Sequence, residues 1–369
     1  MVNLDPSRVI EVLHNPPSVG RPTILPDFFL DHFVITGSLD EFIQGLKRLA
    51  EQGGGNLTGT THLIRRGGNS VNTASALLTL GMNPCLIVKT DRQGASLLRS
   101  LVSPQLDLGH LHVDGRLSAT VSIEAENRGR RVDLMVSDSG SAFDFSYFDL
   151  TESDIQAVLG SPLVALLCLN HNRNAPKLAE DLFSKVHSDS KALTFMDMGD
   201  PSSNVSIVEP LAKRVVSEGL VDILGMNENE AGWFAQAITG EVDKWRDTPT
   251  RPEKWLSAAK LVSHETGVRV DFHTPHFTAT LEDDAVTALP AFDVPVQVTC
   301  GAGDAWNAGN IFGTLVHLET RDRLLLSNSV AAMYVSSASA VHPTREALIQ
   351  FLKGKQALSN IGSKLIRAL

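Results

Sequence analysis

One short segment of the chain places glycines and a carboxylate directly ahead of a helical pattern; it spans 298–309 and reads V-T-C-G-A-G-D-A-W-N-A-G. Gly301 and Gly303 leave the backbone open to any group that approaches it. Apolar residues then recur at spacings of three and four, which predicts a helix that begins here: Ala305, Ala308, Phe312, Leu315 and Val316. The free N–H groups and the positive dipole end of such a helix suit a phosphate or a developing oxyanion.

Asp304 is the residue of this segment that could take part in proton transfer. A carboxylate adds negative charge to an anion site, so its presence is explained if it serves as a general base beside that site. The alternative is an aspartate that caps the helix behind a glycine turn, which is common. The segment alone leaves both interpretations open, because short glycine motifs also occur without function.

A second glycine motif stands far upstream, reads G-G-N-S-V-N-T-A over 67–74, and continues to Leu80-Gly81. Together with the G-A-G-D run at 301–304, and in this order, it resembles the paired signature of the ribokinase-like (PfkB-type) carbohydrate and nucleoside kinase family. The resemblance covers residue 22 to the C-terminus. It implies an α/β fold, the ribokinase-like three-layer sandwich, with a mostly parallel central sheet, helices on both faces and a small β lid.

The resemblance also implies a site for the phosphoryl acceptor, a sugar, polyol or nucleoside, formed by Asp31, Gly68, Asn69 and Asn72. A carboxylate such as that of Asp31 can accept hydrogen bonds from two neighbouring hydroxyls. Asparagine amides both donate and accept, as sugar hydroxyls require. Taken without the family, Asp31 is read as a solvated loop residue and the asparagines as caps of the helix that follows them.

A third motif, Asn227-Glu228-Asn229-Glu230, follows an apolar strand and resembles the family's N-x-x-E motif. The resemblance implies that Asn227 lies at the nucleotide and that Glu230 holds Mg²⁺ through water, which suits a hard cation that keeps several waters. The alternative for the pair is a helix capping box. Asn328, in a helix that resembles the family's adenine-flanking helix, is expected at the nucleotide as well, with ATP as the phosphoryl donor.

Two segments depart from the family pattern. Val270 to His276 lacks the glycines expected near the nucleotide phosphates, and carries His273 and His276 instead. Val298 stands where many members carry an aspartate that helps to bind a monovalent cation, and a valine side chain offers no ligand oxygen. These departures motivate a second hypothesis, a sugar- or nucleoside-binding regulator that no longer catalyses.

The composition is that of an ordinary globular protein, with 369 residues of which 43% are hydrophobic and 20% charged. A net charge of −10 argues against nucleic acid and anionic membranes as partners. The three cysteines have no C-x-x-C spacing, which favours a reducing cytoplasm and no zinc site. The start lacks a signal-peptide pattern, and the longest apolar run, 163–169, is too short to span a bilayer. We expect a cytoplasmic protein.

We expect an N-terminal extension over 1–21 and one kinase domain over 22–369, with the lid contributed by about 31–66 and 112–138. Strand patterns on both sides of 127–130 predict a hairpin within that lid. Strand and helix patterns alternate from 163 to 226, which indicates a parallel sheet. A homodimer through paired lids is the assembly that such lid strands allow.

The expected function is transfer of the γ-phosphoryl group of ATP to a hydroxyl of a sugar, polyol or nucleoside. Asp304 would act as the base, and the amides of Gly301, Ala302 and Gly303 would neutralise charge on the transferring phosphoryl group. Mg²⁺ is the expected cofactor. The motifs leave the identity of the acceptor open.

Overall fold

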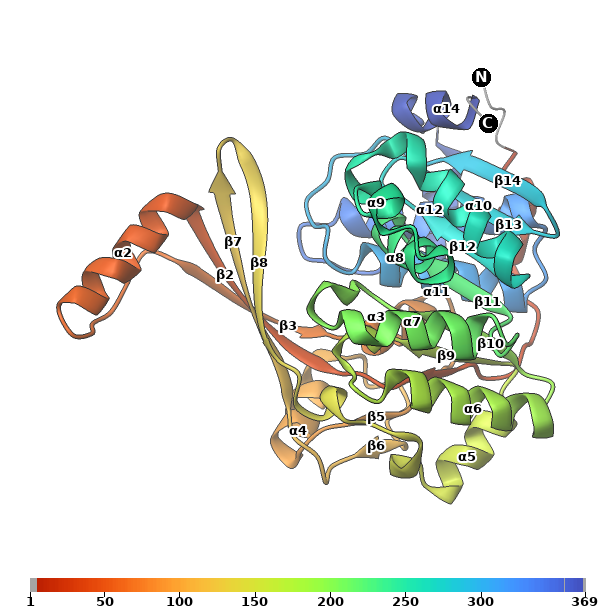
Figure 1. Ribbon diagram of the computed structural model, residues 1–369, viewed down its shortest axis with the longest axis horizontal. Coiled ribbons are helices and arrows are strands. Elements are labelled where there is room, and N and C mark those ends of the chain that lie inside the picture. The colour runs from red at the N-terminus through yellow and green to blue at the C-terminus, as the bar shows by residue number, and fades with distance from the viewer. Residues whose placement is uncertain (1–4, 355, 368–369) are drawn as a thin grey trace.

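The computed structural model of the chain describes residues 5–354 and 356–367, except for the side chains of residues 130 and 131. Its centre is an eight-stranded sheet in the order β14-β13-β12-β11-β10-β9-β1-β4 (Figure 1). Neighbouring strands from β12 to β4 run parallel, whereas β13 and β14 complete an antiparallel edge. The strands span Thr23–Leu25 (β1), Cys85–Leu86 (β4), Leu163–Leu167 (β9), Leu193–Asp197 (β10), Ile223–Met226 (β11), Arg269–His273 (β12), Phe277–Glu282 (β13) and Ala285–Pro290 (β14).

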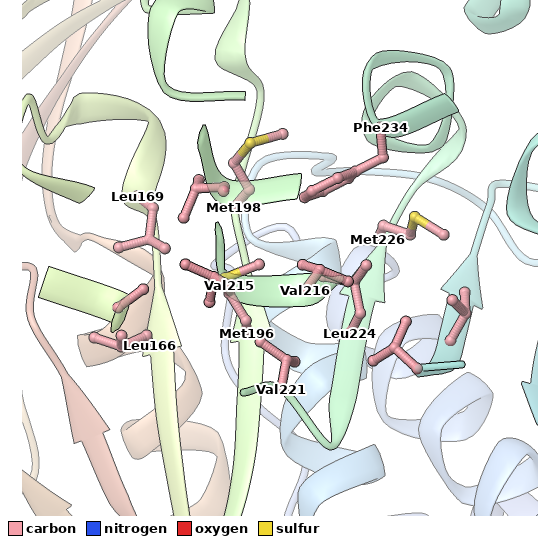
Figure 2. Close-up of a cluster of buried hydrophobic side chains, with 14 of the residues drawn as sticks. Leu166, Leu169, Met196, Met198, Val215, Val216, Val221, Leu224, Met226 and Phe234 are labelled. Atoms are coloured by element: carbon pink, nitrogen blue, oxygen red, sulfur yellow. The ribbon is translucent and has the colours of Figure 1, made fainter. Parts of the chain in front are cut away.

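Alternate residues of the central strands enter two separate hydrophobic cores, one on each face of the sheet. Val164 and Leu166 of β9 join one core, in which Leu166 lies near Met196 of β10 (Figure 2), while Leu163 and Ala165 join the other. Strands that are apolar on both faces are what a parallel sheet covered by helices on both sides requires. The three-layer α/β sandwich predicted from the sequence is therefore confirmed.

Helices cover both cores. The core around Leu166 receives α5 (Glu152–Leu159), α6 (Ala175–Asp189), α7 (Val208–Leu211), α8 (Glu228–Thr239), α9 (Val242–Trp245) and α10 (Pro252–Thr266). The core around Ala165 receives α1 (Ser7–His14), α3 (Asn69–Thr79), α4 (Arg92–Leu101), α11 (Ala302–Leu315), α12 (Thr320–Val335) and α13 (Arg345–Lys353). Between β10 and β11, the helical part of the alternating pattern is not one regular helix but a 3₁₀ turn at Val205–Ile207, the short α7 and a π turn at Ala212–Val216.

The buried carboxylate of Asp271 on β12 holds α11 and α12 against the sheet. It accepts hydrogen bonds from Asn310 Nδ2 on α11 at 2.9 Å, from Arg323 Nη1 on α12 at 2.8 Å and from Arg269 Nη2 at 2.6 Å. Burial by itself would raise the pKa of Asp271, but the two guanidinium groups outweigh burial and hold the pKa well below its usual range. The carboxylate therefore stays charged, and it fixes the position of α11, which carries Asp304.

A small four-stranded sheet in the order β3-β2-β7-β8 projects from the main body (Figure 1). Its strands are β2 (Phe29–Ser38), β3 (Thr61–Gly67), β7 (Ser118–Asn127) and β8 (Arg130–Asp138), and β7 and β8 form the predicted hairpin. Helix α2 (Leu39–Glu51) joins β2 to β3 and lies at the far end of this sheet. A separate pair, β5 (Val88–Lys89) and β6 (Leu111–His112), and α14 (Asn360–Arg367) complete the fold.

The expected N-terminal extension contributes to the main body through α1. Val9, Val12 and Leu13 are buried in the second core, where α1 packs against α12 and α13. Within the described ranges, none of the helices is both long and apolar enough to cross a membrane. Cys85, Cys168 and Cys300 are all free thiols. A cytoplasmic location stays a prediction.

Candidate active site

Two adjoining cavities lie where the parallel strands end and α3 and α11 begin. Cavity A, of about 760 Å³, is lined by ten of the residues singled out from the sequence: Asp31, Gly68, Asn69, Asn72, Asn227, Glu230, Gly301, Ala302, Gly303 and Asp304. Cavity B, of about 880 Å³, shares Asn227, Ala302 and Gly303 with cavity A and adds Asn328. Three motifs that are distant in the sequence therefore meet in one place, at the carboxyl edge of the sheet where ligands of such folds gather.

The glycine turn ahead of α11 has a steric reason for each glycine. Gly301 adopts a positive φ of 85°, and a Cβ there would lie 2.5 Å from the hydroxyl oxygen of Tyr334, which donates to the Cys300 carbonyl at 2.9 Å. A Cβ on Gly303 would lie 3.2 Å from Cε1 of His273. Side chains at either position would fill the space in front of the helix, so the glycines keep the first turn open.

The amides of the first turn of α11 differ in their availability. The N–H of Ala302 donates to the Thr299 carbonyl at 3.1 Å, and the helical ladder begins when Ala305 donates to the Gly301 carbonyl at 3.0 Å. The amides of Gly303 and Asp304 lie between these two bonds, where the helical ladder supplies no acceptor. The donors best placed for an anion are therefore those of residues 303 and 304, whereas the amide of Ala302, part of the expected set at 301–303, is already occupied.

Asp304 is 5% exposed, and its Oδ2 accepts a hydrogen bond from Nδ2 of Asn72 at 2.9 Å. Burial raises the pKa of this carboxyl to about 7, with further upward contributions from the charges of Asp27, Asp197 and Asp31, whereas the hydrogen bond from Asn72 lowers it. A carboxyl group with a pKa near neutrality is suited to accept a proton and to release it again. The geometry supports a base at this position.

Asp31 on β2 lies in cavity A with its carboxyl group against the backbone of Gly67, where an added Cβ would lie 2.1 Å from Oδ2. Burial raises the pKa of Asp31 to about 7, and the charges of Asp27 and Asp133 add to this. The sequence alone left open whether Asp31 is a solvated loop residue. The structure places it in a strand and in the wall of the cavity.

Asp27 is a site residue that the sequence analysis missed. Its carboxylate is buried directly after β1 and accepts hydrogen bonds from the backbone amides of Asn69 and Ser70, both at 2.9 Å, at the start of α3. Burial raises its pKa, against the hydrogen bonds from Ser70 and Asn69. The available signal was an aspartate just beyond a buried strand, comparable to Asp197 at the end of β10. Asp27 thereby occupies the amides of Asn69 and Ser70, so these two N–H groups of α3 are not free for a ligand in cavity A.

Asn227 and Glu230 form the capping box that was one of the two alternatives. The Asn227 side chain accepts from the amides of Asn229 and Glu230 at 2.9 and 3.1 Å, and the Glu230 carboxylate accepts from the backbone and side-chain nitrogens of Asn227, both at 2.9 Å. Burial raises the pKa of Glu230 well above its usual value, and the charge of Asp197 adds to this. Among residues 5–354 and 356–367, no three His, Cys, Asp or Glu side chains gather closely enough to hold a metal ion directly. The oxygens of Asn227, Glu230 and Asp197 that line cavity A fit a cation held through its waters.

Asn328 lines cavity B, but its amide is already engaged by the protein. Its Oδ1 accepts from the indole N–H of Trp306 at 3.1 Å, and its Nδ2 donates to the Pro290 carbonyl at 3.2 Å. These bonds hold Trp306, which also lines cavity B, and tie α12 to the end of β14. Direct contact between Asn328 and a nucleotide stays a prediction.

Solved structures share this fold, although neither a protein-family model nor a curated protein sequence matches the chain. Arabidopsis thaliana ribokinase, solved with ribose and ATP, is 15% identical with a TM-score of 0.69 over 92% of this chain and 100% of its own. Sinorhizobium meliloti adenosine kinase is 16% identical, with a TM-score of 0.61 over 95% and 100%. Burkholderia thailandensis nucleoside kinase, solved with inosine, is 12% identical, with a TM-score of 0.60 over 91% and 99%. Identities this low show the ribokinase-like fold, and the activity has to be argued from the site.

A substitution at Gly68 tests the close packing between the Asp27 carboxylate and the residue that precedes α3. Gly68 and Gly59 share a φ of +90°, but a Cβ on Gly68 would lie 2.7 Å from Asp27 Oδ2, whereas nothing lies within 4 Å of one on Gly59. Gly59→Ala is expected to lower the free energy of unfolding by about 1 kcal/mol, because alanine disfavours a left-handed backbone. Gly68→Ala is expected to cost about 1–3 kcal/mol more, because its methyl group displaces the carboxylate. Urea denaturation measures both, and equal losses would contradict the fit described here.

Proposed function

We propose that this protein is a kinase that transfers the γ-phosphoryl group of ATP to a hydroxyl of a sugar, polyol or nucleoside. One observation carries the proposal: the buried carboxyl group of Asp304 lies in the same cavity as Asp31, Asn69 and Asn72, at the helix terminus that also borders cavity B. An acceptor in cavity A and a nucleotide in cavity B would meet at Gly303. The solved structures that contain ribose with ATP and inosine support this choice of ligands.

The acceptor would be held by its hydroxyl groups in cavity A. The carboxylate of Asp31 accepts from hydroxyls, Asn69 and Asn72 offer amides, and Gly68 lets the ligand approach the backbone. The reacting hydroxyl points at Asp304, which takes its proton. The alcohol oxygen then forms a bond to the γ-phosphorus while the bond from that phosphorus to the β,γ-bridging oxygen breaks, so ADP leaves and the proton remains on Asp304 until solvent removes it.

The amino end of α11 would neutralise the phosphoryl group in transfer. Gly303 lines both cavities and Asp304 lines cavity A, so the amides of these residues and the positive end of the helix dipole would act where the two cavities adjoin. Asn227 and Glu230 would orient the waters of a magnesium ion, which supplies charge neutralisation of the phosphates when it is bound. Asn328 would act on the nucleotide through Trp306, whose indole it holds.

The small sheet would serve as the lid. Asp31, Thr120 and Ser137 pair with one another across β2, β7 and β8, and all three line cavity A. Closure of such a sheet over the acceptor would exclude water, which competes as a phosphoryl acceptor. The adjacent row, His32, Val121 and Val136, points to the opposite face, where Val121 is 38% and Val136 66% exposed. This apolar face is where the lid of a second copy would pair in a homodimer.

The second candidate function is a ligand-binding regulator on the same fold. The specific observation in its favour is the segment from Val270 to His276, which lacks the glycines of the family pattern and brings His273 against Gly303. This protein would bind ATP or a sugar in the cavities without turnover. The activity screen below separates the two functions.

The proposal is tested by an unbiased acceptor screen, with ATP, ADP and GTP as donors and sugars, polyols and nucleosides as acceptors. We expect a phosphorylated alcohol with ATP as donor. Asp304→Asn is expected to retain acceptor binding and to lose about a hundredfold or more in kcat, the scale of general-base catalysis. Ligand binding without any phosphorylated product would favour the regulator, and near-normal turnover by Asp304→Asn would rule out the proposed base.

The elevated pKa of Asp304 predicts how activity depends on pH. A base must be deprotonated to work, and burial raises the pKa of Asp304 to about 7, so the working form is lost as the pH falls below 7. We expect kcat/KM to fall by at least about tenfold per pH unit below pH 7, because burial raises the pKa of Asp31 to about 7 as well, and to level off above it. Circular dichroism at pH 5.5 controls for loss of the fold. A kcat/KM that stays constant from pH 5.5 to 8 would contradict this account.

A further inference from the structure

His273 lies at the boundary between the two cavities, and the kinase mechanism described above gives it no role. It is the last residue of β12, which lies beside β11 and two strands from β10 in the sheet (Figure 1). Asn227 directly follows β11, and Asp197 ends β10. Its side chain lines both cavity A and cavity B. A phosphoryl group that passes from a nucleotide in one cavity to an alcohol in the other has to pass this residue.

The imidazole ring is held against the amino end of α11. It packs on Trp306 with ring centroids 5.0 Å apart, and a Cβ added to Gly303 would lie 3.2 Å from Cε1 and 3.7 Å from Nε2. The side chain is 15% exposed. The ring edge that carries Nε2 therefore faces the same turn whose amides are the proposed phosphoryl donors.

Nε2 of His273 is a buried nitrogen without a hydrogen-bond partner among the described residues. The nearby carboxylate oxygen, Oδ2 of Asp197, is 4.0 Å away, which is too far for a hydrogen bond, and it already accepts from Nδ2 of Asn307 at 2.7 Å. A buried polar atom without a partner costs stability and calls for a specific explanation. An oxygen of a bound anion at the start of α11 would satisfy it.

We propose that His273 is a catalytic residue that donates an N–H hydrogen bond to an oxygen of the phosphoryl group in transfer. This inference rests on the proposed kinase function and adds a side-chain donor to the backbone amides of Gly303 and Asp304. The indole of Trp306 packs against the imidazole and would hold the ring in place. The arrangement also explains how the chain manages without the glycines of the family pattern between Val270 and His276: a side chain takes the place of exposed backbone amides.

The test compares two substitutions of His273 in the full-length protein. His273→Leu removes the donor at similar size, and His273→Gln restores an N–H group. We expect His273→Leu to lower kcat by about tenfold to a hundredfold, below the effect of removing one oxyanion donor because the backbone amides remain. KM for the acceptor should change less than threefold, and His273→Gln should recover most of the loss. His264→Leu, on the exposed face of α10, is the matched control and should leave kcat unchanged.

The affinity for nucleotide complexes tests the role of His273 without relying on turnover. Tryptophan fluorescence, reporting through Trp306, follows binding of ADP alone and of ADP with aluminium fluoride, a mimic of the planar phosphoryl group. We expect His273→Leu to weaken the ADP–aluminium fluoride complex about tenfold while ADP alone binds as in the wild type. Equal affinities in wild type and variant, unchanged kcat in His273→Leu, or equal losses in both variants would overturn the role of His273. Absence of turnover in the wild type would instead overturn the kinase function.

Discussion

The candidate site depends on one hydrogen bond, which joins Asn72 of α3 to Asp304 of α11. The two helices come from motifs that are separated by most of the chain, and both pack on the same face of the central sheet. The bond holds Oδ2 of Asp304 in cavity A and leaves the first turn of α11 facing cavity B. In the proposed kinase, this contact between α3 and α11, with the hydroxyl of Thr73 donating to the Asp304 carbonyl beside it, would place acceptor, base and phosphoryl site relative to one another.

Negative charges near this bond, together with burial, raise the pKa of Asp304. Asp27, Asp31 and Asp197 all raise the pKa of Asp304 in addition to burial, and Asn72 opposes them. Asp27 is itself held by the amides at the start of α3, so its charge is fixed beneath the site. The helix terminus of α11 supplies the compensating positive potential, which explains how a chain with a net charge of −10 could handle phosphate.

Local patterns in the sequence were sufficient for the β7–β8 hairpin, for strands β9 to β11 and for the helix that follows the second glycine motif. The ten predicted residues that line cavity A came mainly from the family resemblance. The capping box of Asn227 and Glu230 was foreseeable because its residues are three apart. Asp27 was missed because its partners, Asn69 and Ser70, are over forty residues away and only the fold brings them together. The raised pKa of Asp304 and the unpaired nitrogen of His273 depend on burial by several elements, which no single segment encodes.

A double-mutant cycle on Asn72 and Asp304 tests the central contact most directly, with kcat measured at saturating substrates. If Asn72 acts on the reaction through the carboxyl group of Asp304, Asn72→Ala should lower kcat in the wild-type background and have no further effect in Asp304→Asn. If the two losses instead multiply, the two residues work independently, and the bond between them is not what sets up the site.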